Sequence, residues 1–136
     1  MLIVDANVLV AAMNRRDRHH ERMTALLDGR DDQFVVTPYI VAEVTYLVQK
    51  FAGPAAETQF MEAVRNGDFH QEELTSQDLT RIVELMRQFE DLPLGAADAS
   101  NVAVAERLKI REIATIDHHF RAVRPRGIDF FTVIPG

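Results

Sequence analysis

The first ten residues, MLIVDANVLV (residues 1–10), contain an apolar triplet, Leu2 to Val4, that ends directly at an aspartate. Short apolar segments of the same kind recur at residues 34–36, 113–116 and 130–133, each bounded by polar or turn residues. Such segments are typical of strands that are covered on both faces. Longer segments separate them, and this alternation predicts an α/β fold with a mostly parallel sheet.

The segments between the predicted strands carry helix signals. Thr37-Pro38 is a typical helix start, and apolar residues then recur at helical spacing along residues 40–51, before Gly53-Pro54 ends the pattern. Further helices are predicted at residues 55–64, 76–89 and 95–108. No repeat or linker divides the sequence, so we expect one domain over residues 1–136.

Composition narrows the class of protein. The chain has 136 residues, enough for one globular core, and no cysteine, which excludes disulfides, thiolate metal sites and a cysteine nucleophile. Its apolar stretches are shorter than the roughly 18 residues of a membrane helix, and no basic region precedes the apolar N-terminus. We therefore expect a soluble cytoplasmic protein that does not contact a membrane.

The charge is unevenly distributed along the chain. The net charge of −6 argues against wholesale adhesion to nucleic acid. Residues 101–136, however, contain six basic and four acidic residues, and a second basic group, Arg15, Arg16, Arg18 and Arg22, follows the first apolar segment. These clusters could hold a polyanion, or they could form a solvated arginine surface.

Four acidic residues are candidates for a common site. Asp5 and Asp117 each follow a predicted strand, which places them where α/β sheets hold their ligands. Glu43 falls at the edge of the buried face of its helix, and Asp98 shares a helix face with apolar side chains but with no basic partner. Structural explanations stay open as well: helix capping for Asp5 and Asp117, a surface position for Glu43 and the helix dipole for Asp98.

A divalent cation would offset the repulsion between these four carboxylates. Converging carboxylates repel, and a fold tolerates the cost when a cation supplies positive charge. An all-oxygen ligand set suits Mg²⁺ or Mn²⁺. Asn7 and Thr115 lie two residues from Asp5 and Asp117 and could orient these carboxylates, or could serve a turn and a strand.

The histidines give no zinc signal. His19-His20 and His118-His119 are adjacent dipeptides, whose side chains diverge on a helix or a strand. Neither pair has the spacing of a zinc site. We therefore expect these side chains to be solvated or packed.

With these residues in place, the sequence resembles the PIN-domain ribonucleases, in particular the VapC-type toxins of bacterial toxin–antitoxin pairs. The resemblance covers nearly the whole chain and ends with FTVIP (131–135). Four stretches carry it in order: VDANVLV (4–10), TPYIVAEVTYLV (37–48), LPLGAADASNVAVAERL (92–108) and ATIDHHF (114–120). No single stretch is specific, but the ordered set is.

The resemblance implies a PIN-like three-layer fold, with a mostly parallel central sheet flanked by helices. It implies a Mg²⁺-dependent endoribonuclease, with Mn²⁺ as the alternative metal, that cleaves structured RNA, either transfer RNA or the large ribosomal RNA. It also implies a homodimer and a cognate antitoxin as partners. Its metal-binding and catalytic acids would be Asp5, Glu43, Asp98 and Asp117, supported by Asn7 and Thr115.

In this interpretation, arginines hold the phosphates that flank the cleaved bond, and the candidates are Arg15, Arg16, Arg18 and Arg121.

Two alternative functions come from other classes of protein. An aspartate-dependent phosphotransfer domain is disfavoured because Asn7 stands where such phosphatases have a second aspartate. A non-catalytic binding module would retain its function without metal, so metal-dependent cleavage distinguishes the two classes.

Overall fold

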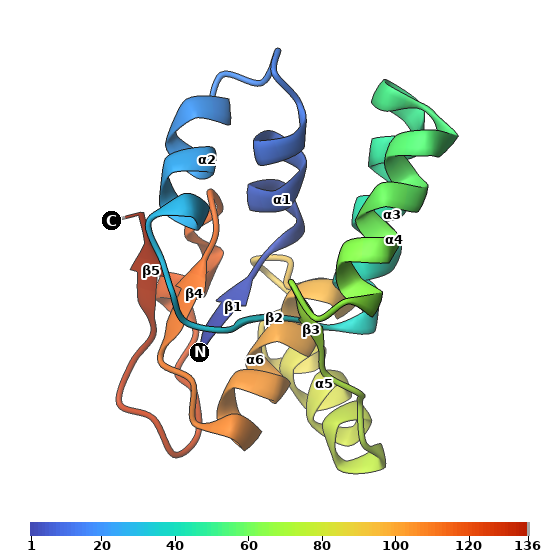
Figure 1. The fold of residues 1–136 in the computed structure, drawn as a ribbon. Coiled ribbons are helices and arrows are strands. Elements are labelled where there is room, and N and C mark those ends of the chain that lie inside the picture. The colour runs from blue at the N-terminus through green and yellow to red at the C-terminus, as the bar shows by residue number, and fades with distance from the viewer. Residues whose placement is uncertain (136) are drawn as a thin grey trace.

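The computed structural model describes residues 1–135. All strands of its single five-stranded sheet are parallel, and their order is β3-β2-β1-β4-β5 (Figure 1). The sheet is therefore more regular than the mostly parallel sheet that the sequence predicts. The strands are β1 (Leu2–Val4), β2 (Phe34–Val36), β3 (His70–Gln71), β4 (Glu112–Ala114) and β5 (Thr132–Ile134).

In the described part of the chain, six α-helices and one 3₁₀ helix connect these strands. They are α1 (Ala6–Met13), α2 (His20–Asp28), α3 (Pro38–Ala52), α4 (Pro54–Arg65), α5 (Ser76–Gln88), α6 (Ala96–Leu108) and the 3₁₀ helix η1 (His118–Ala122). Local caps fix several starts: the Thr37 hydroxyl accepts the backbone N–H of Ile40 at α3, and Thr75 and Asp78 form a capping box at α5. Within residues 1–135, no helix is both long and apolar enough to cross a membrane.

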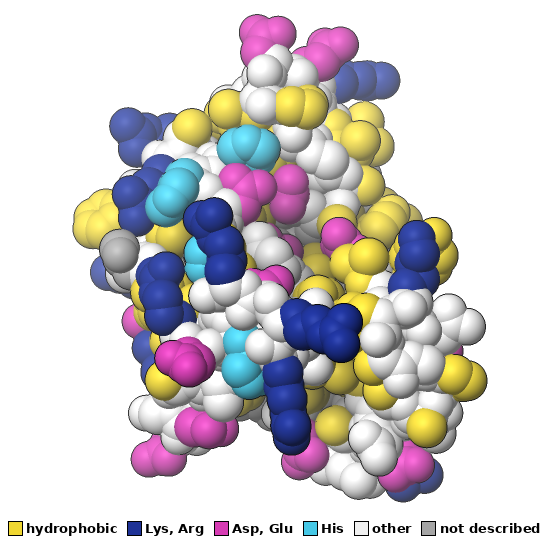
Figure 2. Space-filling view, turned by 90° about the horizontal axis from the view of Figure 1, so that it is seen from above, with side chains coloured by type: hydrophobic (Ala, Val, Ile, Leu, Met, Phe, Trp, Pro, Cys, Tyr) yellow, Lys and Arg dark blue, Asp and Glu magenta, His cyan; other side chains and the backbone are white. Residues whose placement is uncertain are grey.

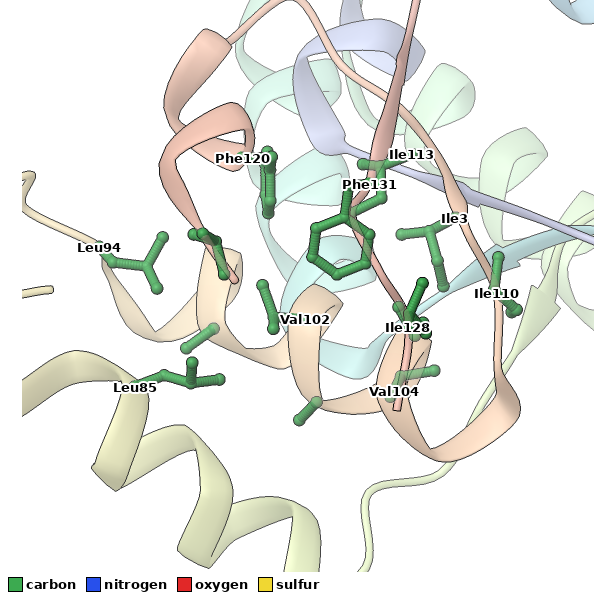
Figure 3. Packing of buried hydrophobic residues seen from close by; sticks show 14 of the residues in the cluster. Ile3, Leu85, Leu94, Val102, Val104, Ile110, Ile113, Phe120, Ile128 and Phe131 are labelled. Carbon is green, nitrogen blue, oxygen red and sulfur yellow. The ribbon is translucent and has the colours of Figure 1, made fainter. Parts of the chain in front are cut away.

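Helices cover both faces of the sheet, because successive strand side chains point to opposite sides. One core joins alternate strand residues, such as Ile3 and Ile113, to α5, α6 and η1 (Figure 3). The other joins Leu2, Val4 and Val36 to α1, α2, α3 and α4. The three-layer α/β expectation is confirmed.

Three details of the strand prediction are wrong. β3 was not predicted, because His70 and Gln71 are polar residues at the sheet edge. β4 ends at Ala114, before Ile116, and β5 begins at Thr132, after the exposed Phe130. Ile116 packs against a core beyond the end of β4, whereas Phe130 is exposed before β5, so an apolar side chain alone does not mark a strand residue.

Candidate active site

The acidic residues gather at the carboxyl ends of the strands. β1 pairs with β2 on one side and with β4 on the other. The strands β2 and β3 are therefore added on one side of β1, and the later strands β4 and β5 on the other side. A crevice forms at such a switch point in parallel sheets. Asp5 directly follows β1 and caps α1, whereas Asp117 lies three residues beyond β4 and caps η1. Figure 2 looks onto this end and shows acidic side chains with basic and histidine side chains around them.

Asp5 is the most buried of the four acids, with 5% of its surface exposed. Its carboxylate accepts hydrogen bonds from the Thr115 hydroxyl at 2.8 Å, the backbone N–H of Ala6 at 2.9 Å and the Asn101 amide at 3.4 Å. Burial raises its pKa from 3.8 to about 6, against the lowering effect of the Thr115 bond, and the charges of Asp98 and Glu43 raise the pKa further. Asp5 thus both caps α1 and belongs to the acidic group.

Asp98, in the first turn of α6, meets Asp117 and His119. One side-chain ligand atom of each lies within 4.8 Å of the other two. Burial raises the pKa of Asp98, and the charges of Asp117 and Glu43 act in the same direction, while His119 opposes them. The four predicted acids therefore lie close enough for their charges to interact.

His119 departs from the prediction that the histidines are only solvated or packed. Asp117 accepts the backbone N–H of His119 at 2.9 Å, and this turn brings the imidazole back to the carboxylate. Nδ1 of His119 lies 3.2 Å from Oδ2 of Asp117, but without the alignment of a hydrogen bond. His20 does follow the prediction, because its ring packs beside α1 with Nδ1 2.9 Å from the Ala11 carbonyl oxygen.

Thr115 and Asn7 lie between the acids. The Thr115 hydroxyl donates to Asp5 and accepts the backbone N–H of Asp117 at 3.0 Å, so one side chain links the acids after β1 and β4. The Asn7 amide donates to Thr115 at 3.3 Å, and its carbonyl accepts the backbone N–H of Ile116 at 3.2 Å. These contacts restrict the orientation of Thr115 and of the Asp5 carboxylate, and they hold the backbone at Asp117.

Glu43 projects from α3 as an exposed side chain and lines a cleft of about 440 Å³ beside Asp117. Two further polar residues at the site were missed in the sequence. Asp17 lines the same cleft from the turn before α2. Asn101 is fully buried, donates to Asp5, and leaves its own carbonyl oxygen without a partner within the described chain. Its spacing of three residues from Asp98 on one helix was an available signal.

The candidate RNA-binding arginines lie outside the acidic group. Arg15 and Arg16 line a pocket with Phe51, Arg18 lines a cleft before α2, and Arg121 is exposed on η1. None of these four arginines forms an ion pair within residues 1–135. Their guanidinium groups are free to bind an external anion.

The side-chain groups gathered at the acidic site fit a hard divalent cation as ligands. Carboxylate oxygens dominate it, with one imidazole from His119 at the edge. The pKa values of Asp5 and Asp98 are raised by burial and by mutual repulsion, which is the electrostatic environment that a cation relieves. Oxygen ligands of this type suit Mg²⁺ or Mn²⁺ better than zinc.

Known proteins resemble this chain in sequence and in fold. The family model described as PIN domain matches residues 2–124. Ribonuclease VapC26 of Mycobacterium tuberculosis is 33% identical over 135 residues, which span 98% of this chain and all of that protein. The solved structure of M. tuberculosis VapC20, described as a sarcin–ricin loop cleaving toxin, superposes with a TM-score of 0.81 at 20% identity, over 90% of this chain and 94% of that one. FitAcB from Neisseria gonorrhoeae has a TM-score of 0.66 at 18% identity, over 86% and 88% of the two chains.

Proposed function

This chain belongs to the PIN domain family, in its VapC-type branch, and on that premise we propose that it is a metal-dependent endoribonuclease and the toxin of a toxin–antitoxin pair. The convergence of Asp5, Asp98 and Asp117 at the switch point of the sheet carries the proposal, with Glu43 on the adjoining cleft. A non-catalytic binding module gives no reason to hold four acids together at a cost in free energy. A phosphotransfer domain is disfavoured because Asn7 stands where such phosphatases have a second aspartate.

The metal would be held by Asp5, Asp98, Asp117 and Glu43, with Mg²⁺ as the expected ion and Mn²⁺ as the alternative. When bound, it would screen the phosphate from the acids and stabilise the charge that develops during cleavage. Asn7 and Thr115 would hold the Asp5 carboxylate and the backbone of Asp117 in place through the contacts described above. His119 would restrict Asp117 from the other side.

The reaction is hydrolysis of a phosphodiester. Asp98 or Asp117 would orient a water molecule and accept its proton as the water oxygen attacks phosphorus. The bond from phosphorus to the 3′ oxygen breaks, and that oxygen leaves as a hydroxyl after gaining a proton, so the products carry a 5′-phosphate and a 3′-hydroxyl. The raised pKa of Asp98 suits a group that must accept a proton.

The substrate would be structured RNA, either transfer RNA or the large ribosomal RNA. Arg15, Arg16, Arg18 and Arg121 would bind phosphates on each side of the cleaved bond, which adds affinity without reading sequence. Mapping the new 5′ ends in cells that express the protein distinguishes the two RNA classes. The same role places the protein in the cytoplasm, where both RNAs reside.

The decisive experiment is incubation of purified protein with total RNA and Mg²⁺, with and without EDTA. We expect cleavage that EDTA abolishes and that Asp5→Asn and Asp98→Asn both remove. Asp129→Asn, which neutralises an exposed aspartate outside the site, is the matched control and should cleave normally. Binding of RNA without cleavage in every condition would favour the binding module instead.

We also propose two protein partners, a cognate antitoxin and a second copy of this chain. The helix α5 exposes three apolar side chains at positions i, i+4 and i+7: Leu79, Val83 and Met86. A stripe of this kind is suited to burial against another protein. Light scattering of the purified protein should give twice the monomer mass, and Val83→Glu should reduce it to one. A monomeric wild-type protein would contradict the dimer.

A further inference from the structure

A second cleft, of about 360 Å³, adjoins the acidic one. Arg18 and His19 precede α2, Arg22 lies in its first turn, and His118 opens η1. The buried Met23 and Pro135, which follows β5, also line the cleft. This cleft lies at the same end of the sheet as the acids.

The two clefts share a wall. His19 and Ile116 line both of them, and Thr115, which lines the second cleft, donates its hydroxyl to Asp5. A molecule that fills the second cleft is therefore next to the groups that hold the scissile bond. Any strand that crosses Ile116 enters both clefts.

The charges of the two clefts are opposite. The acidic cleft is lined by Asp17, Glu43 and Asp117, whereas no side chain of residues 1–135 brings a carboxylate to the second cleft. Arg18 and Arg22 form no ion pair within the described chain. Nε of Arg18 donates to Nε2 of His19 at 3.2 Å, which orients the guanidinium and leaves its terminal nitrogens to bind something else.

The start of α2 adds to this positive character. His19 occupies the N-cap position, and no side chain caps the helix. The first backbone N–H groups of a nine-residue helix carry a partial positive charge, which favours an anion at that end. Two arginines, two histidines and a helix N-terminus thus converge on one cavity.

We propose that this cleft binds a backbone phosphate of the RNA strand, adjacent to the phosphodiester that is cleaved. Guanidinium groups bind phosphate oxygens with two parallel hydrogen bonds, and the cleft offers two such groups. A phosphate held there fixes the register of the strand, so that the next phosphate lies against the carboxylates. The inference rests on the proposed ribonuclease function, and it assigns Arg22 and His118 to substrate binding in addition to Arg18.

The test is the binding of a fluorescently labelled single-stranded RNA oligonucleotide of mixed sequence, measured by anisotropy in EDTA at several salt concentrations. EDTA prevents cleavage, so the measurement is independent of catalysis. We compare the wild type with Arg18→Ala and Arg22→Ala. Arg111→Ala is the matched control, because Arg111 is also exposed and without an ion pair but lies at the opposite end of β4.

Each phosphate contact contributes about 0.7 to the slope of log K against log salt for a single strand. We therefore expect Arg18→Ala and Arg22→Ala each to reduce the slope by about 0.7 and to weaken binding about fivefold at roughly 0.1 M salt. Arg22→Lys, which keeps the charge, should retain the slope. Arg111→Ala should leave both quantities unchanged.

Unchanged affinity and slope in both alanine variants would overturn the proposal, even if EDTA-sensitive cleavage is observed. An equal loss in Arg111→Ala would overturn it too, because the effect would then be one of overall charge. A selective loss in Arg18→Ala and Arg22→Ala supports the phosphate site, even if no condition yields cleavage and the ribonuclease proposal fails. Equal thermal melting temperatures for all variants exclude a folding defect.

Discussion

Replacing Asp5 by Asn is expected to stabilise the metal-free protein while removing its activity. Asp5 is 5% exposed, and burial raises its pKa from 3.8 to about 6. The folded state therefore binds the proton more tightly than the unfolded state does. Folding is penalised wherever the carboxyl must be ionised, and an amide at this position avoids the penalty.

The size and sign of the effect follow from the pKa. At low pH both states are protonated, and Asp5 contributes no penalty. As the pH rises from about 4 to about 6, the unfolded state loses its proton first, and the protein loses stability. Above pH 6 the penalty is constant, at about 3 kcal/mol. The advantage of Asp5→Asn over wild type should therefore grow by about 2 to 3 kcal/mol between about pH 4 and pH 7.5.

Urea unfolding of both proteins in EDTA, at a series of pH values, measures this difference. Surface carboxylates such as Asp32, whose pKa is lowered to about 2 by Arg30, titrate equally in both proteins and cancel. Asp129→Asn is the control and should show no such pH dependence. A difference that is constant with pH would refute the reasoning. Adding Mg²⁺ should reverse the order, since a ligand at about 1,000 times its Kd stabilises wild type by about 4.1 kcal/mol, which exceeds the penalty of about 3 kcal/mol.

Three further predictions concern stability. Asp98→Asn should raise the melting temperature of the metal-free protein, because the raised pKa of Asp98 comes from burial and from the charge of Asp117, and a lower value in calorimetry would contradict this. Arg81→Ala should cost about 3 kcal/mol in urea unfolding, because it removes the guanidinium that donates to the Glu106 carboxylate, 9% exposed, at 2.8 and 2.9 Å, and leaves that carboxylate the backbone N–H of Arg126. Thr75→Ala should cost about 1 kcal/mol through loss of the capping box at α5, and Thr75→Ser should restore most of it.

The fold was predictable wherever local signals decide it. β1 and β2 match the predicted residues, since a strand buried on both faces must be continuously apolar. The start of α3 was predictable because Thr37 and Pro38 act within one turn. β3 was not predictable, because a two-residue edge strand is held by the backbone pairing of β2 and has no pattern of its own.

The acids of the site were predictable by position, but their surroundings were not. Each acid follows a strand or lies on a helix face, and the local order of apolar and polar residues indicates both kinds of position. Thr115 meets Asp5 across 110 positions of sequence, and only the pairing of β1 with β4 brings them together. The contact between His119 and Asp117 was not predicted, because adjacent side chains diverge on a regular helix or strand. A 3₁₀ turn capped by Asp117 instead folds the imidazole back onto the capping carboxylate.

Tertiary pairing likewise decides which arginines are left without an ion pair and so can take the proposed role in binding RNA. By composition, residues 101–136 form a basic cluster, but Arg107 is bound to Glu72 and Asp78, and Arg126 to Glu84. A guanidinium committed to a carboxylate brings no net charge to a phosphate. The count of basic residues therefore overstates that segment. Within the described residues, the four arginines of residues 15–22 form no ion pair, and two of them, Arg18 and Arg22, line the cleft beside Thr115. Although the net charge of the chain is −6, Arg18 and Arg22 therefore supply unpaired positive charge on the cleft that adjoins the acids.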